Sequence, residues 1–375
     1  MNRTFRVSSL AGLTRFGRCV KTVKYLNREY TKSELMAYAG NIRQIIGAER
    51  LQLAEGNADG ARLIRVYNGS GMEFFLVESR CLDMLSMTYK GIPMNFLSKN
   101  GLFYPLRYLP TDADDTLKHL AGGMFYTCGT ANVGWECVDD GKKQVNHGRI
   151  KAMSATNVAV QGRWTEDDYE IEISGEIRET SLFDENMVLR RTIRTSLGKP
   201  VVHIRDEIEN ESFATQPFMY MYHLNMGFPF VDRETRVFTS PAEISVRDPE
   251  TERFISQYQQ MDAPESPGRE ICLMHAFREK GVVVNGAVNR RLGLGFYVRQ
   301  NTETMPFLHQ WKTNIAGTYA MGMEPANCHC EGRIREREVY HTLRSLKPFE
   351  KVVVEIELGI LEGSEELDAF EQAMI

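Results

Sequence analysis

Two short segments place side chains that can exchange protons beside residues typical of a strand end. His223 lies in the segment Tyr-His-Leu-Asn-Met-Gly (222–227), together with the amide of Asn225. Glu324 lies in the apolar segment Met-Gly-Met-Glu-Pro (321–325), directly before a proline that cannot donate to a strand ladder. A carboxyl group among apolar residues needs a partner or acquires a raised pKa, which is common where protons are transferred. The two residues are candidates for acid–base chemistry, and a structural ion pair is the alternative for Glu324.

Further candidates are found among the eight histidines and three tryptophans. His147 lies in a polar, turn-like segment (Gln-Val-Asn-His-Gly-Arg, 144–149), and His309 precedes Gln-Trp. Trp311 presents an aromatic face that can stack on the C–H groups of a ligand, and a position in the core is an equally good interpretation. His203 alternates along a predicted strand, so we interpret it as a surface or core residue.

A metal site is the least supported chemistry. His329 lies between Cys328 and Cys330, and together with His147 these residues suggest zinc. Cys-x-Cys is nevertheless a weak zinc signal without a second Cys or His pair at suitable spacing. We therefore expect neither a metal nor another cofactor.

The composition is typical of a globular protein that works on a small molecule. The 375 residues are 42% hydrophobic and 25% charged, which is enough apolar material for a large core. A formal net charge of -5 creates no field that attracts nucleic acid, and no stretch approaches the roughly 18 consecutive apolar residues of a membrane span. The seven cysteines are irregularly spaced, so we expect reduced thiols and a cytoplasmic protein.

The beginning of the chain is basic. Between residues 1 and 28 there is no acidic residue, and the basic ones are Arg3, Arg6, Arg15, Arg18, Lys21, Lys24 and Arg28. We interpret this segment as a structural arm, although such composition is also typical of organelle transit peptides. A capping box that starts at Thr31 and apolar residues at three- and four-residue spacing then predict a helix that ends at Gly47.

After this helix the apolar period becomes that of β-strands. Strand-like segments separated by turn residues lie at 63–77, 157–210, 282–284, 294–298 and 352–358. No strand-then-helix alternation of a parallel α/β sheet occurs. We therefore predict a mainly β protein, with an N-terminal arm and helix at 1–50 and a sandwich domain at 51–375, which ends in a short acidic helix at 364–373.

The order of these motifs resembles that of the aldose 1-epimerases, the galactose mutarotase-like enzymes. The shared order is Asn-His-Gly (146–148), Tyr-His-x-Asn-x-Gly (222–227), Glu-Pro (324–325) and Leu-Lys-Pro-Phe-Glu (346–350) before a final strand. The similarity extends from about Leu51 to Leu361. The resemblance implies a large antiparallel β-sandwich (supersandwich) with a sugar-binding cleft.

The resemblance also implies roles for individual residues. His223 takes the place of the general acid and Glu324 that of the general base. Arg80 with Leu82-Asp83 resembles an arginine motif of a divergent, poorly characterised branch, and the aromatic signature after the acid histidine is reduced here. The predicted substrate-binding residues are Arg80, Asp83, His147, Asn225 and Trp311.

These observations predict an isomerase of carbohydrate metabolism that interconverts sugar anomers by acid–base ring opening and reclosure. One base and one acid suffice for this reaction. Two alternatives stay open: another sugar epimerase or isomerase that uses the same cleft, and a non-catalytic carbohydrate-binding module. A small-molecule sugar is the expected partner, while the identity of the sugar and the formation of a homodimer stay open.

Overall fold

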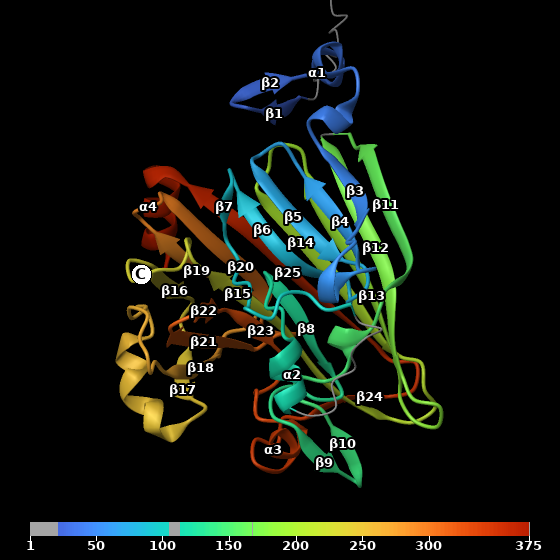
Figure 1. Cartoon of the computed structure of the whole chain (residues 1–375), viewed down its shortest axis with the longest axis vertical. Helices are drawn as coiled ribbons and strands as arrows, with labels where there is room; N and C mark the ends of the chain where they lie inside the picture. Colours follow the sequence, from blue (N-terminus) through green and yellow to red (C-terminus); the bar gives the residue numbers. More distant parts are fainter. Residues whose placement is uncertain (1–21, 105–112, 167, 375) are drawn as a thin grey trace, which may run out of the picture.

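The computed structural model describes residues 22–104, 113–166 and 168–374. These residues form four α-helices and two large antiparallel β-sheets, which pack face to face (Figure 1). The helices are α1 (Lys32–Ala39), α2 (Ala113–His119), α3 (Arg333–Glu338) and α4 (Gly363–Ala373). Short 3-10 helices cover Ile42–Gln44, Gly56–Ala58, Ile150–Ala152 and Pro249–Gln257.

The smaller of the two sheets has eight strands and includes the meander predicted at 157–210. In spatial order its strands are β11 (Thr156–Trp164), β12 (Tyr169–Thr180), β13 (Asn186–Ser196), β14 (Val201–Asn210), β25 (Lys351–Glu362), β20 (Leu294–Asn301), β19 (Val282–Asn289) and β16 (Arg236–Thr239). Each of these strands pairs antiparallel with its neighbours. The prediction of a mainly antiparallel β fold is confirmed.

The larger sheet has thirteen strands and carries the residues of interest. Its main path runs through β17 (Glu243–Val246), β18 (Glu270–Ala276), β21 (Phe307–Ile315), β22 (Thr318–Gly322), β15 (Gln216–Gly227), β8 (Phe125–Thr130), β6 (Asp83–Tyr89), β5 (Met72–Val77), β4 (Arg62–Tyr67) and β3 (Gly47–Gln52). Shorter strands that join it are β7 (Ile92–Pro93), β23 (Glu324–Ala326) and β24 (Arg344–Leu346). Two small hairpins, β1 (Val23–Tyr25) with β2 (Arg28–Tyr30) and β9 (Cys137–Asp139) with β10 (Lys142–Gln144), lie outside both sheets.

The side chains of strand β15 alternate between the core of the sandwich and the opposite face of the larger sheet. Successive side chains of a strand point to opposite faces. Tyr220 and Tyr222 belong to the large core between the sheets, whereas Met219 and Met221 belong to a second, smaller apolar cluster. His223 therefore points to the second face, away from the sandwich core.

The N-terminal appendage lies at one end of the sandwich (Figure 1). Thr31 caps α1 with the predicted capping box, but the helix ends at Ala39 and not near Gly47. The reason is Gly40, whose positive φ of 62° stops the helix, so that Gly47 is free to start β3. The expected boundary after residue 50 stays a prediction, and the basic arm expected at 1–28 lies mostly outside the described residues. The acidic helix predicted at 364–373 is confirmed as α4.

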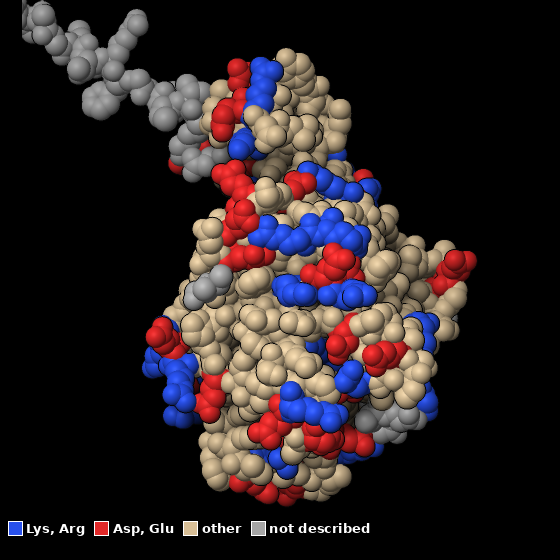
Figure 2. Space-filling view, turned by 90° about the vertical axis from the view of Figure 1, so that its left-hand side faces the viewer, with Lys and Arg blue, Asp and Glu red and all other residues tan. Residues whose placement is uncertain are grey.

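Basic and acidic side chains are intermixed on the face of the molecule seen in Figure 2. Ion pairs also form between neighbouring strands of the smaller sheet, such as Arg190 with Glu209 at 2.6 Å and Arg194 with Glu172 at 2.7 Å. Exposed pairs of this kind contribute little to stability and neutralise one another. None of the described helices is long and apolar enough to cross a membrane.

Candidate active site

The candidate site is built on one row of residues across the larger sheet. His223 on β15 is opposite Tyr126 on β8, and Glu324 on β23 is opposite His309 on β21. β15 also pairs with β22 and β23 in a register that places His223 across from Glu324. Directly opposed residues have Cβ atoms about 4.5 to 5.5 Å apart. Strand pairing alone therefore brings two imidazoles, a carboxyl group and a phenol together.

His223 and Glu324 form a close pair, which we call the acid–base pair. Nδ1 of His223 lies 3.0 Å from Oε1 of Glu324, and the two residues are only 8% and 2% exposed. Despite this distance, neither atom has an aligned hydrogen-bond partner. Buried polar atoms without a partner are costly and rare, so they indicate where a ligand atom binds.

Burial decides where the proton of the acid–base pair resides. Desolvation raises the pKa of Glu324 well above its ordinary value and lowers the pKa of His223 to about 3. Both shifts favour the uncharged forms, a carboxylic acid and a neutral imidazole. The pair therefore offers one donor and one acceptor at the same time, as acid–base catalysis requires.

A second buried pair shows what a structural His–Glu contact looks like in the same protein. Nδ1 of His329 lies 3.0 Å from Oε2 of Glu336. The same carboxyl group accepts hydrogen bonds from the backbone N–H of His329 at 2.9 Å and from Oγ1 of Thr342 at 2.6 Å. The imidazole also stacks on Tyr340 at a centroid distance of 3.7 Å. This pair is saturated and the acid–base pair is not, which favours a functional role for the latter.

Gly322 provides the space that the Glu324 carboxyl group occupies. Residues two positions apart along an extended chain share a face. A Cβ atom at position 322 would lie 2.2 Å from Oε1 of Glu324 and 3.1 Å from Cβ of Trp311. Only a glycine leaves room for the carboxyl group to reach His223.

His147 approaches the acid–base pair from a tight turn, and its ring centroid lies 5.4 Å from that of His223. The backbone N–H of Gly134 donates to Nδ1 of His147 at 3.3 Å, so the proton of the neutral imidazole lies on Nε2. Burial lowers the pKa of His147 well below its ordinary value, which keeps the ring neutral. His147 and Gly148 have φ values of 55° and 71°, and a Cβ atom on Gly148 would collide with the carbonyl of Gly129. The turn that carries His147 therefore requires glycine at position 148, which explains the His-Gly motif.

Aromatic rings flank the acid–base pair on two sides. Tyr126 stacks on His223 with a centroid distance of 4.4 Å, and Trp311 meets the same imidazole edge-on at 5.8 Å. Nε1 of Trp311 donates to Glu270 at 3.0 Å, which fixes the orientation of the indole. Trp311 is half-buried, so part of its ring is available to a ligand beside His223.

Arg80 lies at the edge of the site. Its Nε donates to the carbonyl oxygen of Lys151 at 3.3 Å, and it lines a small cavity of about 20 Å³ together with Tyr126. Lys151 is buried, and its Nζ donates to the carbonyl of Gly148 at 2.6 Å. Burial lowers the pKa of Lys151 to about 8. Lys151 thus holds the turn that carries His147.

Two of the predicted binding residues, Asp83 and Asn225, form hydrogen bonds within the protein. The carboxylate of Asp83 accepts hydrogen bonds from Oγ1 of Thr127 at 2.6 Å and from Arg191 at 2.9 Å, inside the sandwich core. Nδ2 of Asn225 donates to the backbone carbonyl of His223 at 2.8 Å. These bonds position the strands that carry the site, and the sugar-binding role expected for Asp83 and Asn225 stays a prediction.

A larger cavity of about 590 Å³ borders Gly148 but not the acid–base pair. Several charged groups of its lining pair with one another, since Arg333 lies 2.7 Å from Asp139 and Lys142 bonds to Asp184. Such paired charges are less suited to proton transfer than the acid–base pair, whose facing atoms have no hydrogen-bond partner. We therefore place the candidate site at the acid–base pair and not in this cavity.

Sequence reasoning missed Tyr126, Lys151 and Gly322. Tyr126 follows the Gly-Gly segment at 122–123, but its contact with His223 depends on the pairing of β8 with β15. No sequence pattern singled out Lys151, which lies in a short 3-10 helix. The position of Gly322 two residues before Glu324 was the one local feature that could have indicated its role.

The sequence matches a known family over most of the sandwich. Residues 58–360 match the family described as Domain of unknown function (DUF4432). The chain belongs to this family. No curated protein matches the sequence of this DUF4432 member.

Solved structures identify the fold of this DUF4432 protein. A "putative aldose 1-epimerase" from Klebsiella pneumoniae superposes with a TM-score of 0.81 at 19% identity, covering 89% of this chain and 90% of that one. A galactose mutarotase-like protein from Clostridium acetobutylicum has a TM-score of 0.59 at 12% identity, with 85% and 99% covered. A galactose 1-epimerase from Lactobacillus acidophilus has a TM-score of 0.56 at 11% identity, with 85% and 100% covered. At these identities the similarity shows the galactose mutarotase-like β-sandwich and leaves the activity to the site.

Proposed function

We propose that this protein is a sugar mutarotase of the aldose 1-epimerase type, which interconverts the α and β anomers of an aldose. The observation that supports the proposal most strongly is the acid–base pair, in which His223 and Glu324 approach within 3.0 Å without an aligned hydrogen bond. A small-molecule sugar as the substrate agrees with the fold of the solved relatives.

The reaction requires a base at the C1 hydroxyl and an acid at the ring oxygen. Both oxygens are bonded to C1, so the two catalytic groups have to lie within a few ångström of each other, as His223 and Glu324 do. Glu324 takes the proton of the C1 hydroxyl while His223 donates a proton to the ring oxygen, and the bond between C1 and the ring oxygen breaks. After rotation about the C1–C2 bond the aldehyde recloses on its other face, with both proton transfers reversed.

The single proton of the acid–base pair makes these roles consistent with the burial of both groups. Burial favours the uncharged form of each group, and moving one proton from the carboxyl group of Glu324 to His223 when the sugar binds produces the carboxylate base and the imidazolium acid. The net charge of the buried site does not change during this transfer. Each positioned group typically contributes about 10²- to 10⁴-fold to the rate.

The other side chains of the site hold the sugar. Nε2 of His147 carries a proton and can donate to a hydroxyl, because Nδ1 is occupied by the N–H of Gly134. The half-buried ring of Trp311 suits stacking on the C–H face of the sugar, and Arg80 lies at the edge of the site. These contacts keep the transient aldehyde in register for reclosure.

Exchange NMR on a panel of free and phosphorylated aldoses tests the proposal, since anomer interconversion broadens the C1 proton signals. We expect Glu324→Gln and His223→Ala each to lower kcat by about 10²-fold or more on the sugar that the wild type interconverts. Glu336→Gln, which makes the same change in the structural pair, is the matched control and keeps kcat once thermal unfolding shows that it is folded. Full activity of Glu324→Gln would refute the assignment of the base. Binding of a sugar without turnover by the wild type would instead indicate a carbohydrate-binding module.

A further inference from the structure

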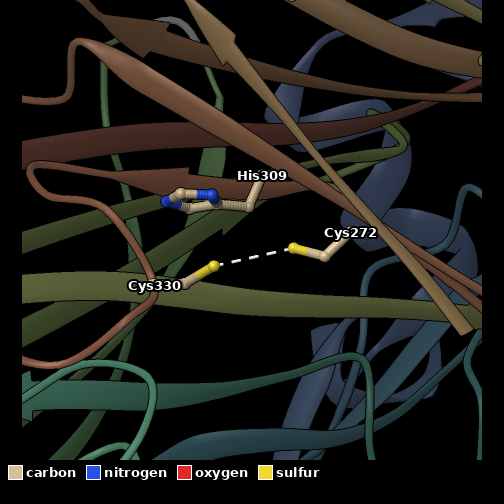
Figure 3. Close-up of side chains that lie close together, drawn as sticks. All are labelled: Cys272, His309 and Cys330. Carbon is tan, nitrogen blue, oxygen red and sulfur yellow. Dashed lines mark hydrogen bonds between the residues drawn. The ribbon is translucent and has the colours of Figure 1, made fainter. Parts of the chain in front are cut away.

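Three side chains with metal-binding atoms meet beside the acid–base pair. Cys272 lies on β18, His309 on β21, and Cys330 between β23 and α3. Their ligand atoms all lie within 4.8 Å of one another, and all three residues are buried. Figure 3 shows the two sulfurs facing each other beneath the imidazole of His309. Strand pairing again explains the meeting, because His309 is opposite Met274, two positions from Cys272 on the same face of β18.

His309 has the tautomer that a metal ligand needs. Its Nε2 lies 2.8 Å from the backbone carbonyl oxygen of Cys328, and a carbonyl can only accept, so Nε2 carries the proton. Nδ1 therefore has a free lone pair, and this buried atom has no hydrogen-bond partner. Metal-binding histidines typically donate their other ring N–H to a carbonyl or carboxylate in this way, which fixes the ring.

The separation of the two sulfurs matches a shared metal ion better than a disulfide. Sγ of Cys272 lies 3.6 Å from Sγ of Cys330. Two Zn–S bonds of about 2.3 Å at a tetrahedral angle place their sulfurs about 3.8 Å apart. A disulfide would require the sulfurs to approach to about 2.05 Å. The cysteines therefore need little movement to bind zinc and much more to oxidise.

The geometry points to a zinc site formed by Cys272, His309 and Cys330, with the fourth tetrahedral position taken by water or another small ligand. Two thiolates and one imidazole are a soft donor set that suits zinc and not magnesium or calcium. Binding releases the two thiol protons to solvent, so the charge of the two thiolates balances that of the ion.

This site differs from the zinc motif that the sequence suggested. Only Cys330 is common to both sets. His329 is held by Glu336, and Cys328 contributes its backbone carbonyl to His309 while its side chain lies in the apolar cluster. The spacing of Cys272, His309 and Cys330 along the chain carries no recognisable zinc pattern.

Metal analysis of the full chain, purified without chelators, tests the inference. We expect about one zinc per chain, and after stripping we expect zinc titration to release about two protons per ion in calorimetry with two buffers. Cobalt in place of zinc should give a thiolate-to-metal charge-transfer band. Because these measurements use the wild-type protein, they do not depend on any variant folding.

Three variants locate the ion. Cys272→Ser and Cys330→Ser should each weaken zinc binding by at least about 10²-fold, since even the loss of a supporting partner of a ligand costs 10- to 100-fold. Cys128→Ser changes another buried thiol of the same apolar cluster and should bind zinc as the wild type does. Glu324→Gln should also bind zinc normally, so a failure of the proposed catalysis leaves this test intact. A wild type without zinc uptake and without the cobalt band, or a Cys272–Cys330 disulfide in most molecules of unreduced protein, would overturn the inference.

Discussion

The substitution Gly322→Ala tests whether the position of the Glu324 carboxyl group controls the activity. Gly322 makes no side-chain contact of its own, and it pairs with Asn225 through the backbone of β15. Its new Cβ atom would lie 2.2 Å from Oε1 of Glu324. The carboxyl group is the end of a flexible side chain, so it can move away while the backbone keeps its place.

The size of the effect follows from that overlap. To restore an ordinary contact of more than 3 Å, Oε1 has to move by about 1 Å, which removes it from its position 3.0 Å from Nδ1 of His223. A displacement of about 1 Å from the productive geometry costs about 10²-fold in rate, or about 2.7 kcal/mol of activation free energy. The free energy of unfolding should fall by no more than about 1 to 3 kcal/mol, the ordinary cost of overpacking.

Anomer exchange by NMR, read as separate kcat and KM values, measures the effect. We expect kcat to fall and KM to change little, because the displaced carboxyl group acts in the proton transfer and not in holding the sugar. Gly162→Ala in the smaller sheet is the matched control: it also adds a Cβ atom to a strand glycine, where it would meet the hydroxyl of Tyr169 on the neighbouring strand β12. This control should lose stability without losing kcat.

A folded Gly322→Ala protein with the kcat of the wild type would refute the reasoning. It would mean either that Glu324 acts from a position other than the one beside His223, or that the carboxyl group takes no part in the reaction. Equal losses of kcat in both alanine variants would also contradict it, because the effect would then come from general loosening of the sandwich.

Three further predictions concern binding and stability. His147→Ala should raise KM more than it lowers kcat in the exchange assay, because its N–H holds hydroxyls in the ground state and in the transition state; a loss confined to kcat would contradict this role. Trp311→Phe should keep the KM of the wild type and Trp311→Ala should raise it, since stacking needs an aromatic face and not the indole N–H. Equal KM values for the two variants would mean that Trp311 is a core residue and does not contact the sugar. Asp139→Asn should lower the free energy of unfolding by about 1.5 to 3 kcal/mol at pH 7, because hydrogen bonds from Arg337 lower the pKa of Asp139. The low pKa stabilises the fold only while the carboxylate of Asp139 is ionised. The difference in unfolding free energy between Asp139→Asn and the wild type, measured by urea titration, should therefore shrink as the pH falls below about 4. A difference that stays constant with pH would contradict the assignment.

The sequence by itself determined the local structure and the candidates for chemistry. The two-residue period of the segments at 157–210 predicted a meander, and the capping box at Thr31 predicted the start of α1, because both depend on residues that are neighbours along the chain. The resemblance of the order of the His-Gly, His-x-Asn and Glu-Pro motifs to that of the aldose 1-epimerases pointed to His147, His223 and Glu324. The end of α1 was placed wrongly because Gly40 competes with a continuing apolar pattern, and a pattern does not show which of two glycines adopts a positive φ.

Only the tertiary structure decided which of these side chains meet. The pairing of β15, β23 and β21 places His223, Glu324 and His309 in one row, and a shift of one residue in any pairing would turn its side chains to the other face. Contacts between other distant segments send Asp83 to the sandwich core and bring Cys272 and Cys330 together. Register is set by contacts between strands that are far apart along the chain, so a linear pattern names the reactive groups but does not determine their partners.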